Sequence, residues 1–352
     1  MRRGRAIAAA LVLVGLVAPR QLPGCPRLPR VDAVGAGIAW VVDGGSSHLF
    51  STQDGRLLRT LQPAFAVMVV HFDAKRSEFW GAAWGDSPTL WSWSESRGFQ
   101  TVSVPAREIY STFQSEDGRR LIAATLSTAA SPDEVYEAFV ALGIWDENQV
   151  RFVRLAPPAA HGDSDAVSIL GDDALFGYLI DTALVTPMLP SVDLSADTSL
   201  WFARIPGRGR WLMAEDGTLR VRLSEDGGRT WIPTGELPAP PPGHQFHIAG
   251  LHSDPYRKHL YALVGVAGGQ MGSLSVSADG GRQWSPVLVQ TSWLPPLFDA
   301  EGVWIPEALD AVDRSITLKL LKPDGTIIRA LRLRLPQAEA TPEEDPTEEE
   351  EF

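Results

Sequence analysis

Two short segments in the C-terminal half of the chain share one unusual pattern of residues. Residues 224–231 read Ser-Glu-Asp-Gly-Gly-Arg-Thr-Trp, and residues 277–284 read Ser-Ala-Asp-Gly-Gly-Arg-Gln-Trp. The two copies start roughly 50 residues apart, which is the length of one supersecondary unit. A repeat of this period is typical of solenoids and propellers, and no other feature constrains the fold as strongly.

The repeated pattern describes a turn that makes its own side-chain hydrogen bonds. Asp followed by glycine allows backbone angles that most side chains avoid, and Ser and Asp side chains can bond to backbone groups of the same turn. The Trp that follows begins the next strand and buries a large flat surface between neighbouring units. We therefore predict structural roles for eight residues: Ser224, Asp226, Gly228, Trp231, Ser277, Asp279, Gly281 and Trp284.

These two segments resemble Asp-box repeats, also called BNR repeats, which occur in sialidases, sortilin-type receptors and photosystem assembly factors. In those proteins the repeat joins the outer two strands of propeller blades. The resemblance implies an all-β propeller of four-stranded antiparallel blades. Because Asp-box proteins have many unrelated functions, it implies little about what this chain does.

Alternating apolar residues and turn residues divide much of the chain into units of similar length. The clearest unit spans residues 244–290, where four short strand-like runs are joined by turns. The same order recurs in residues 64–105, and residues 70–73 of that unit match residues 251–254 of the first. Residues 108–157 form another such unit. Each unit is interpreted as one blade.

The number of blades depends on residues 158–238. At about 80 residues this stretch is too long for one blade and slightly short for two. If residues 183–194 supply strands, the propeller has seven blades, which we favour; if they form an insertion, it has six. Shorter units near the two ends of the chain suggest a further hypothesis, in which the ends share one blade and close the ring.

The N-terminal residues predict export. A basic start, Met-Arg-Arg-Gly-Arg, precedes an apolar run over residues 6–18, which is typical of a secretory signal and short for a membrane span. An uncleaved signal anchor is the alternative. The single cysteine, Cys25, follows Leu-Pro-Gly in a sequence that resembles a bacterial lipoprotein cleavage box, so we interpret it as a lipid attachment site. An ordinary unpaired Cys beside a normal cleavage site is the other interpretation.

Residues 337–352 are strongly acidic and contain two prolines. Such a segment cannot bury enough apolar surface to fold, so we expect residues 337–352 to be a disordered, solubilising tail. Its charge, within a chain of net charge -12, argues against a nucleic-acid partner. The predicted organisation is a signal peptide over residues 1–24, a linker over 25–35, the propeller over 36–336 and this tail.

The candidate catalytic feature is Arg204. The sequence Phe-Ala-Arg-Ile-Pro at residues 202–206 is similar to the aromatic-Arg-Ile-Pro motif of sialidases, whose Arg clamps the sugar carboxylate. An extra Ala separates the aromatic residue from the Arg, and the motif falls in the middle of the chain. None of the five tyrosines lies in a motif that matches a sialidase nucleophile. We therefore name no catalytic residue and treat Arg204 as a candidate ligand-binding residue.

Two tryptophans and four histidines complete the candidates. Trp91 and Trp93 lie on the same face of a predicted strand and are candidate stacking surfaces for a sugar. Four histidines fall within residues 244–259, but residues three apart on a strand point to opposite sides, so we predict no metal site. No segment suggests a cofactor.

Together these observations predict an exported propeller, periplasmic, attached to the outer membrane as a lipoprotein, or secreted. We expect a monomer that acts as a non-catalytic binding or assembly module of the bacterial envelope, with a protein or glycan ligand on a propeller face. The lipid anchor would be its only contact with a membrane. The alternative function is a sialidase-type glycoside hydrolase acting on acidic sugars, so enzymatic activity stays an open question at this stage.

Overall fold

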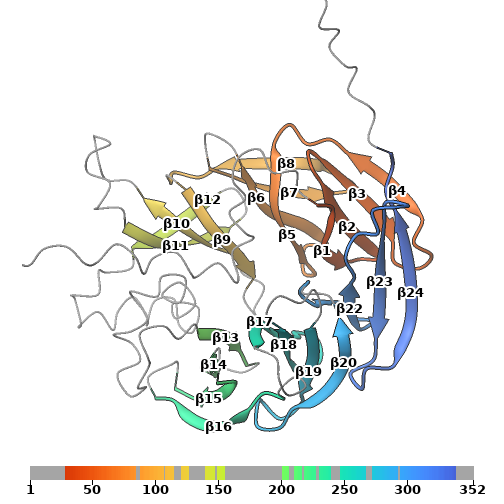
Figure 1. Cartoon of the computed structure of the whole chain (residues 1–352). Coiled ribbons are helices and arrows are strands. Elements are labelled where there is room, and N and C mark those ends of the chain that lie inside the picture. The colour runs from red at the N-terminus through yellow and green to blue at the C-terminus, as the bar shows by residue number, and fades with distance from the viewer. Residues whose placement is uncertain are drawn as a thin grey trace, which may run out of the picture.

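The computed structural model describes residues 28–337 apart from 85–87, 107, 115–119, 127–138, 147–148, 155–199, 206–209, 216–217, 227–229, 239–245, 267–271 and 292–293. Within these residues the chain forms six four-stranded sheets, each of which is antiparallel and follows the order of its strands in the sequence. We number the sheets as blades 1 to 6. The protein is an all-β propeller, and Figure 1 shows its blades arranged around a common centre.

The first three blades contain twelve strands. Blade 1 contains β1 (Arg30–Gly35), β2 (Ile38–Asp43), β3 (Ser46–Ser51) and β4 (Leu57–Leu61). Blade 2 contains β5 (Ala66–Asp73), β6 (Glu78–Trp84), β7 (Thr89–Ser94) and β8 (Gly98–Ser103). Blade 3 contains β9 (Glu108–Gln114), β10 (Arg120–Leu126), β11 (Phe139–Asp146) and β12 (Gln149–Arg154).

The other three blades contain the remaining strands. Blade 4 contains β13 (Leu200–Arg204), β14 (Trp211–Glu215), β15 (Arg220–Ser224) and β16 (Ile232–Glu236). Blade 5 contains β17 (Phe246–Ser253), β18 (Leu260–Val266), β19 (Gly272–Ser277) and β20 (Ser285–Thr291). Blade 6 contains β21 (Leu297–Phe298), β22 (Val303–Pro306), β23 (Ser315–Leu321) and β24 (Ile327–Arg334).

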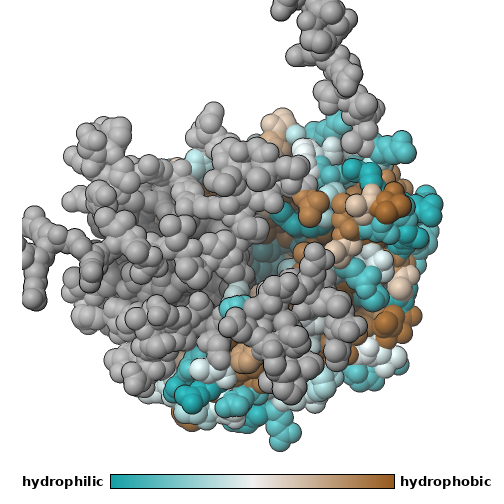
Figure 2. Space-filling model, viewed as in Figure 1, coloured by the Kyte–Doolittle hydropathy of each residue, from teal (hydrophilic) through white to brown (hydrophobic). Residues whose placement is uncertain are grey.

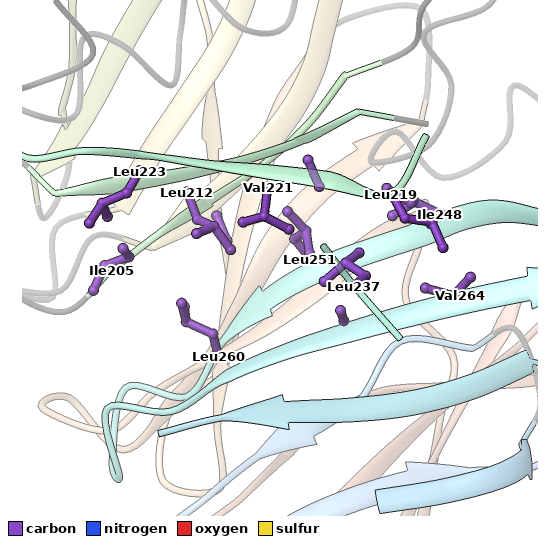
Figure 3. Close-up of a cluster of buried hydrophobic side chains, with 13 residues drawn as sticks. Ile205, Leu212, Leu219, Val221, Leu223, Leu237, Ile248, Leu251, Leu260 and Val264 are labelled. Carbon is purple, nitrogen blue, oxygen red and sulfur yellow. The ribbon is translucent and has the colours of Figure 1, made fainter. Parts of the chain in front are cut away.

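The core is formed between blades, where apolar faces of neighbouring sheets meet. Figure 3 shows one such cluster, in which Leu212 and Val221 of blade 4 face Leu251 and Val264 of blade 5. Similar clusters join blade 1 to blade 2, blade 2 to blade 3, and blade 5 to blade 6. At these four boundaries the blades bury their strands against each other, as the period of the sequence predicts.

The ring closes by packing two complete blades together. Blades 1 and 6 share a buried cluster that includes Phe50, Trp304 and Leu333. An ion pair between Arg314 and Asp43, with 2.7 Å from Nη2 to Oδ2, crosses the same boundary. The hypothesis that the chain ends share one blade is therefore wrong, because each end supplies four strands of its own.

Strand β1 corrects the predicted boundary between linker and propeller. It lies in residues 30–35, within the predicted linker, and it pairs with β2 as the first strand of blade 1. The choice between six and seven blades stays open, because a seventh blade would fall in residues 155–199, outside the described residues. The predicted signal peptide, Cys25 and residues 338–352 lie outside them as well.

The antiparallel order gives the propeller two distinct faces. Turns between the first and second strands, and between the third and fourth, lie at one end of each blade, which we call the Asp-turn face. Turns between the second and third strands lie at the other end. Strand β1 begins there, with Arg30 opposite Val42, and β24 ends there, with Arg334 opposite Ser315. We call this side the terminal face.

Candidate functional site

The turn between β19 and β20 is held together by Asp279. Its carboxylate accepts hydrogen bonds from the Ser277 hydroxyl at 2.8 Å and from the backbone N–H groups of Arg282 and Gln283 at 3.0 and 2.9 Å. The Ser277 hydroxyl oxygen accepts a further bond from the N–H of Gly281 at 2.8 Å. Partial burial acts to raise the pKa of Asp279, but these hydrogen bonds outweigh it and lower the pKa. The carboxylate is therefore held in its charged form.

The turn between β15 and β16 has a closely similar arrangement. Asp226 accepts hydrogen bonds from the Ser224 hydroxyl at 2.9 Å, and from the backbone N–H and hydroxyl of Thr230 at 2.9 and 2.7 Å. Ser224 is fully buried, and Trp231 is buried at the start of the outer strand. Gly228 lies outside the described residues. In both repeats the Asp thus takes part in bonds within its own turn.

These turns also pack against the preceding blade. Gly281 has a φ of 90°, and a Cβ atom there would lie 2.3 Å from Cδ1 of Leu212 in blade 4. The indole N–H of Trp284 donates to the carbonyl of Gly281 at 3.1 Å and fixes the ring beside the turn. In blade 6, a Cβ atom at Gly325 would lie 2.4 Å from the carbonyl oxygen of Val287 in blade 5. The turns therefore join neighbouring blades as well as neighbouring strands.

Blades 1 and 6 have a shorter version of the same turn. Asp54 accepts from the N–H of Arg56 at 3.1 Å, and Asp324 accepts from the N–H of Thr326 at 2.9 Å. A hydrogen bond from the Ser51 side chain is the main cause that lowers the pKa of Asp54. The sequence identified these positions only as Asp-Gly turns, because the Trp and the second Gly of the longer pattern are missing.

A buried ionic cluster joins blades 2 and 3 at the Asp-turn face, and the sequence analysis missed it. Arg120, at the start of β10, donates from Nε to Asp73 at 3.0 Å and from Nη2 to Glu78 at 2.8 Å. All three side chains are at most 6% exposed. Arg76 also pairs with Asp73 at 2.9 Å, and Arg97 pairs with Glu78. Two buried carboxylates are therefore matched by guanidinium groups from both blades.

Aromatic rings and a histidine surround this ionic cluster. The guanidinium carbon of Arg120 lies 5.5 Å from the ring centre of Trp80 and 4.8 Å from that of Trp145, so it is placed between two indole rings. His71 packs on Trp80 and bonds through Nε2 to the carbonyl oxygen of Thr112, at 2.8 Å, in the next blade. Burial lowers the pKa of His71 to about 4, so its ring is neutral at neutral pH.

Blade 5 contains the counterpart of this turn. Asp254 accepts from the N–H groups of Tyr256 and Arg257 at 2.8 and 3.1 Å, and pairs with the Arg257 guanidinium at 3.1 Å. That guanidinium reaches blade 6, where it donates to the carbonyl oxygens of Asp299 and Ala300 at 3.0 and 2.9 Å. The described charged side chains at both boundaries thus act between blades. In the sequence, the match between residues 70–73 and residues 251–254 was the only sign that blades 2 and 5 contain equivalent turns.

Trp91 and Trp93 are not stacking surfaces for a ligand. Trp91 is completely buried, and Trp93 is 5% exposed. Trp91 lies 5.4 Å from Trp40 of blade 1 in a stacked geometry, and its indole N–H donates to the carbonyl of Ala82 at 3.0 Å. The prediction of a sugar platform at these residues is wrong, because the face of β7 that carries them forms the core between blades 1 and 2.

The candidate residue Arg204 is the last residue of β13, which is the first strand of blade 4 and lies at one edge of its sheet. Its backbone pairs with Trp211. Of the tyrosines, Tyr261 is buried, and burial raises its pKa, whereas Tyr256 is partly exposed in the turn after Asp254. The side chain of Arg204 lies outside the described part of the structure, so its role in ligand binding stays a prediction.

Two of the four candidate histidines lie on strand β17 of blade 5. His247 is exposed on β17, and His252 folds over Gly250 of the same strand, with burial lowering the pKa of His252 to about 4. Within the described residues, no group of three or more His, Cys, Asp or Glu side chains is placed to hold a metal ion. The same part of the chain contains no helix long and apolar enough to span a membrane.

Exposed apolar side chains gather along the Asp-turn face. Six large ones, each between 36% and 58% exposed, lie in or directly after a turn on this face of the consecutive blades 4, 5, 6 and 1. We call them the apolar rim: Ile232, Tyr256, Ile327, Ile328, Leu57 and Leu58. Figure 2 shows brown hydrophobic patches at the edge where β4 and β24 lie. The densest part of the apolar rim consists of two pairs of adjacent residues, Leu57 and Leu58 at the start of β4 and Ile327 and Ile328 at the start of β24.

Comparison with known proteins supports the fold. No protein-family model and no curated protein matches the chain. Among solved structures it is similar to the tricorn protease, with a TM-score of 0.51 and 10% identity over 90% of this chain and 27% of that one. TolB from Acinetobacter baumannii gives a TM-score of 0.49 and 11% identity over 86% of this chain and 64% of that one.

A third similar structure is the β-propeller domain of Cps50 (Swd1) from Myceliophteria thermophila. Its TM-score is 0.38, with 12% identity over 90% of this chain and 88% of that one. The chain spans less than two thirds of the tricorn protease and TolB chains. At these identities the likeness concerns the fold alone.

Proposed function

We propose that this protein is a non-catalytic binding module of the bacterial envelope that docks a protein partner on its Asp-turn face. The apolar rim is the observation that carries the proposal. Exposed apolar side chains are common when scattered singly, but here they recur at the same end of four consecutive blades. Such a surface is typical of protein interfaces, whose centres are apolar and whose edges are polar.

The rigid ring behind the rim supports this function. The turns that carry the rim residues are fixed by their own hydrogen bonds and by contact with the preceding blade, as at Asp324 and Gly325 next to Ile327. A surface that is already ordered loses little conformational entropy when a partner binds. We also propose that the Asp-containing turns belong to the Asp-box type, on the basis of the shared Ser–Asp hydrogen bond in blades 4 and 5.

The envelope location rests on the N-terminal sequence. A basic start followed by a short apolar run and Cys25 supports export and lipid attachment. Mass spectrometry of the mature N-terminus tests this part separately: an acylated Cys25 supports it, and a mature chain that retains residues 1–24 contradicts it.

Site-specific crosslinking in intact cells tests the docking face. We place a photo-crosslinking amino acid at Leu58 or Ile328 and, as a control, at Val312 on the terminal face. The proposal predicts one discrete crosslinked protein at both rim positions that disappears when the neighbouring residue is changed by Leu57→Asp or Ile327→Asp. The same pattern at Val312, or a crosslink insensitive to these changes, contradicts it.

The sialidase alternative is tested by activity. It predicts hydrolysis of a fluorogenic sialoside by the purified protein, with a loss of at least a hundredfold on Arg204→Ala. Hydrolysis that depends on Arg204 would replace the binding-module proposal with an enzymatic one.

A further inference from the structure

We propose that the terminal face, at the boundary of blades 1 and 6, rests on the lipid surface, with Leu28 and Val312 in the interfacial layer of the bilayer. This inference rests on the lipid attachment proposed for Cys25, and it adds an orientation. The propeller stands on its terminal face and presents the apolar rim away from the membrane.

The first argument is the length of chain between Cys25 and the fold. Only two residues separate Cys25 from Leu28, so an extended chain spans at most about 10 Å between their Cα atoms. Strand β1 begins at Arg30. An acyl chain on Cys25 therefore holds Leu28, which is 72% exposed, next to the bilayer surface. The start of β1, and with it the terminal face, must therefore also lie near the bilayer surface.

The second argument is the exposure of Val312. This side chain is 97% exposed, and it lies in the turn between β22 and β23 on the terminal face. The ion pair between Arg314 and Asp43 joins this turn to the end of β2, beside which β1 begins. Leu28 and Val312 thus belong to the same edge of the molecule. Outside the apolar rim, they are the only large apolar side chains exposed to this degree among the described residues.

The third argument is that the turn presenting Val312 is well ordered. The backbone N–H of Val312 donates to Asp310 Oδ1 at 3.0 Å, and Asp310 and Ser315 exchange backbone hydrogen bonds. Arg332 pairs with both Asp310 and Asp313. The acidic side chains next to Val312 therefore have guanidinium partners, which reduces their repulsion from an anionic surface. An apolar side chain held outward by a fixed turn is suited to entering an interface.

Tethering the protein to vesicles tests the orientation. Because Cys25 is the only cysteine, the chain beginning at Cys25 can be coupled through its thiol to maleimide lipid in phosphatidylcholine vesicles, whether or not cells acylate it. An azide-bearing residue replaces exposed Ala311 or, as a control on the Asp-turn face, exposed Thr326, and carries an environment-sensitive dye. Nitroxide lipids then report which position contacts the bilayer.

The proposal predicts a blue shift and strong quenching at position 311 and neither at position 326. Val312→Asp should reduce the quenching at 311 about five- to tenfold, whereas the matched change Ile328→Asp should leave it unchanged. Equal quenching at both positions, quenching at 326 alone, or none at either would overturn the proposal. Thermal melting of each variant shows whether the fold is intact.

This result is independent of the docking test. If dye at 311 contacts lipid but no partner crosslinks at the rim, the orientation stands and the proposed function fails. If a partner crosslinks at Leu58 but the tethered protein shows no preferred side, the docking proposal stands and the orientation fails.

Discussion

Blades 2 and 5 contain the same turn, and each pairs a buried Asp of this turn with a guanidinium group that reaches across the boundary to the next blade. The two blades differ in which side of the boundary supplies that guanidinium. Each buries an Asp completely at the end of its first strand: Asp73 is the last residue of β5, and Asp254 directly follows β17. In blade 5 the bridging guanidinium comes from the turn itself, since Arg257 reaches forward to carbonyl groups of blade 6. In blade 2 the bridge comes back from blade 3, where Arg120 enters between two carboxylates.

The difference shows how a repeated unit acquires boundaries of different strength. The boundary of blades 2 and 3 contains two buried carboxylates that share a guanidinium only 6% exposed, and their other guanidinium partners, Arg76 and Arg97, are 37% and 57% exposed. Removing Arg120 therefore leaves both buried carboxylates with weaker, solvent-screened partners. The boundary of blades 5 and 6 has a single buried carboxylate at this turn, and its guanidinium partner is 19% exposed. Both Asp73 and Asp254 accept hydrogen bonds from two backbone N–H groups of their own turn, so this feature does not distinguish them. We therefore expect the first boundary to be more sensitive to substitution.

The largest expected effect is that of Arg120→Ala. It removes the most buried guanidinium of the cluster and leaves Asp73 and Glu78 with only the more exposed Arg76 and Arg97, so we expect a loss of about 3 kcal/mol in the free energy of unfolding. The matched change Arg257→Ala should cost about 2 kcal/mol. Urea denaturation followed by tryptophan fluorescence measures both. If Arg120→Ala does not fold, Arg120→Lys, which keeps the charge, should still be more destabilising than Arg257→Lys; equal costs would contradict the comparison.

The outer turns of the same two blades provide the second test. Gly281→Ala in blade 5 requires a strained φ and a collision with Leu212, so we expect a cost of about 2–3 kcal/mol. Gly98→Ala in blade 2 requires a similar φ but meets no atom within 4 Å, and about 1 kcal/mol is expected. A shift in denaturation midpoint of the same size for both would show that the turn of blade 5 does not depend on its contact with blade 4.

The two equivalent histidines sharpen the comparison further. His71 bonds to Thr112, whereas Nε2 of His252 has no hydrogen-bond partner among the described residues. At pH 7, His71→Leu should cost about 1 kcal/mol through the lost bond, and His252→Leu should be near neutral. Thermal melting distinguishes the two. A larger cost for His252→Leu would mean that its imidazole has a partner such as a buried water molecule.

The same histidines predict the pH dependence of stability. Burial lowers both pKa values from 6.5 to about 4, so the unfolded chain binds more protons than the folded one between these values. The stabilising contribution is complete above pH 6.5 and decreases as the pH falls towards 4. In either Leu variant, up to one proton fewer should be taken up on unfolding in this pH window. The slope of the free energy of unfolding against pH should therefore decrease. An unchanged slope in both variants would contradict this account.

The smallest expected effect concerns the Asp of the repeat. Asp279→Ala removes acceptors for three hydrogen bonds in a partly exposed turn, and we expect about 1 kcal/mol. Ser96→Ala, at the position of blade 2 that corresponds to Asp279, should be close to zero because its only described side-chain bond is a long one with Ser94 at 3.4 Å. Chemical denaturation with the two variants side by side tests this, and equal effects would argue against a special role for Asp279.

Much of the fold could be predicted from the sequence because blade strands have local signals. Alternating apolar residues and turn residues predicted units at residues 64–105 and 244–290, and blades 2 and 5 lie at residues 66–103 and 246–291. Strand β1 was missed because Arg30 and Asp32 give it a polar pattern. The ion pair between them lies within β1, but the bond from Arg30 to the carbonyl of Met68 exists only once blades 1 and 2 lie together.

The candidate sites were harder to predict, because sequence shows which residues share a face but not what that face meets. Trp91 and Trp93 do share a face of β7, yet that face packs on Trp40 of another blade. The apolar rim was missed for a related reason. An apolar pair at the start of a strand has the same local pattern whether the strand is central or outermost.

The sequence by itself determined the period, the strands and the bonded turns, since these depend on residues within a few positions of one another. Only the tertiary structure decided which charges meet, which tryptophans are buried and which face carries the chain ends. Arg120 and Asp73 lie far apart along the chain, and Asp43 and Arg314 come from opposite ends of it. Their pairing follows from the order of blades around the ring, because closing the ring brings distant residues together in a way that no local pattern records.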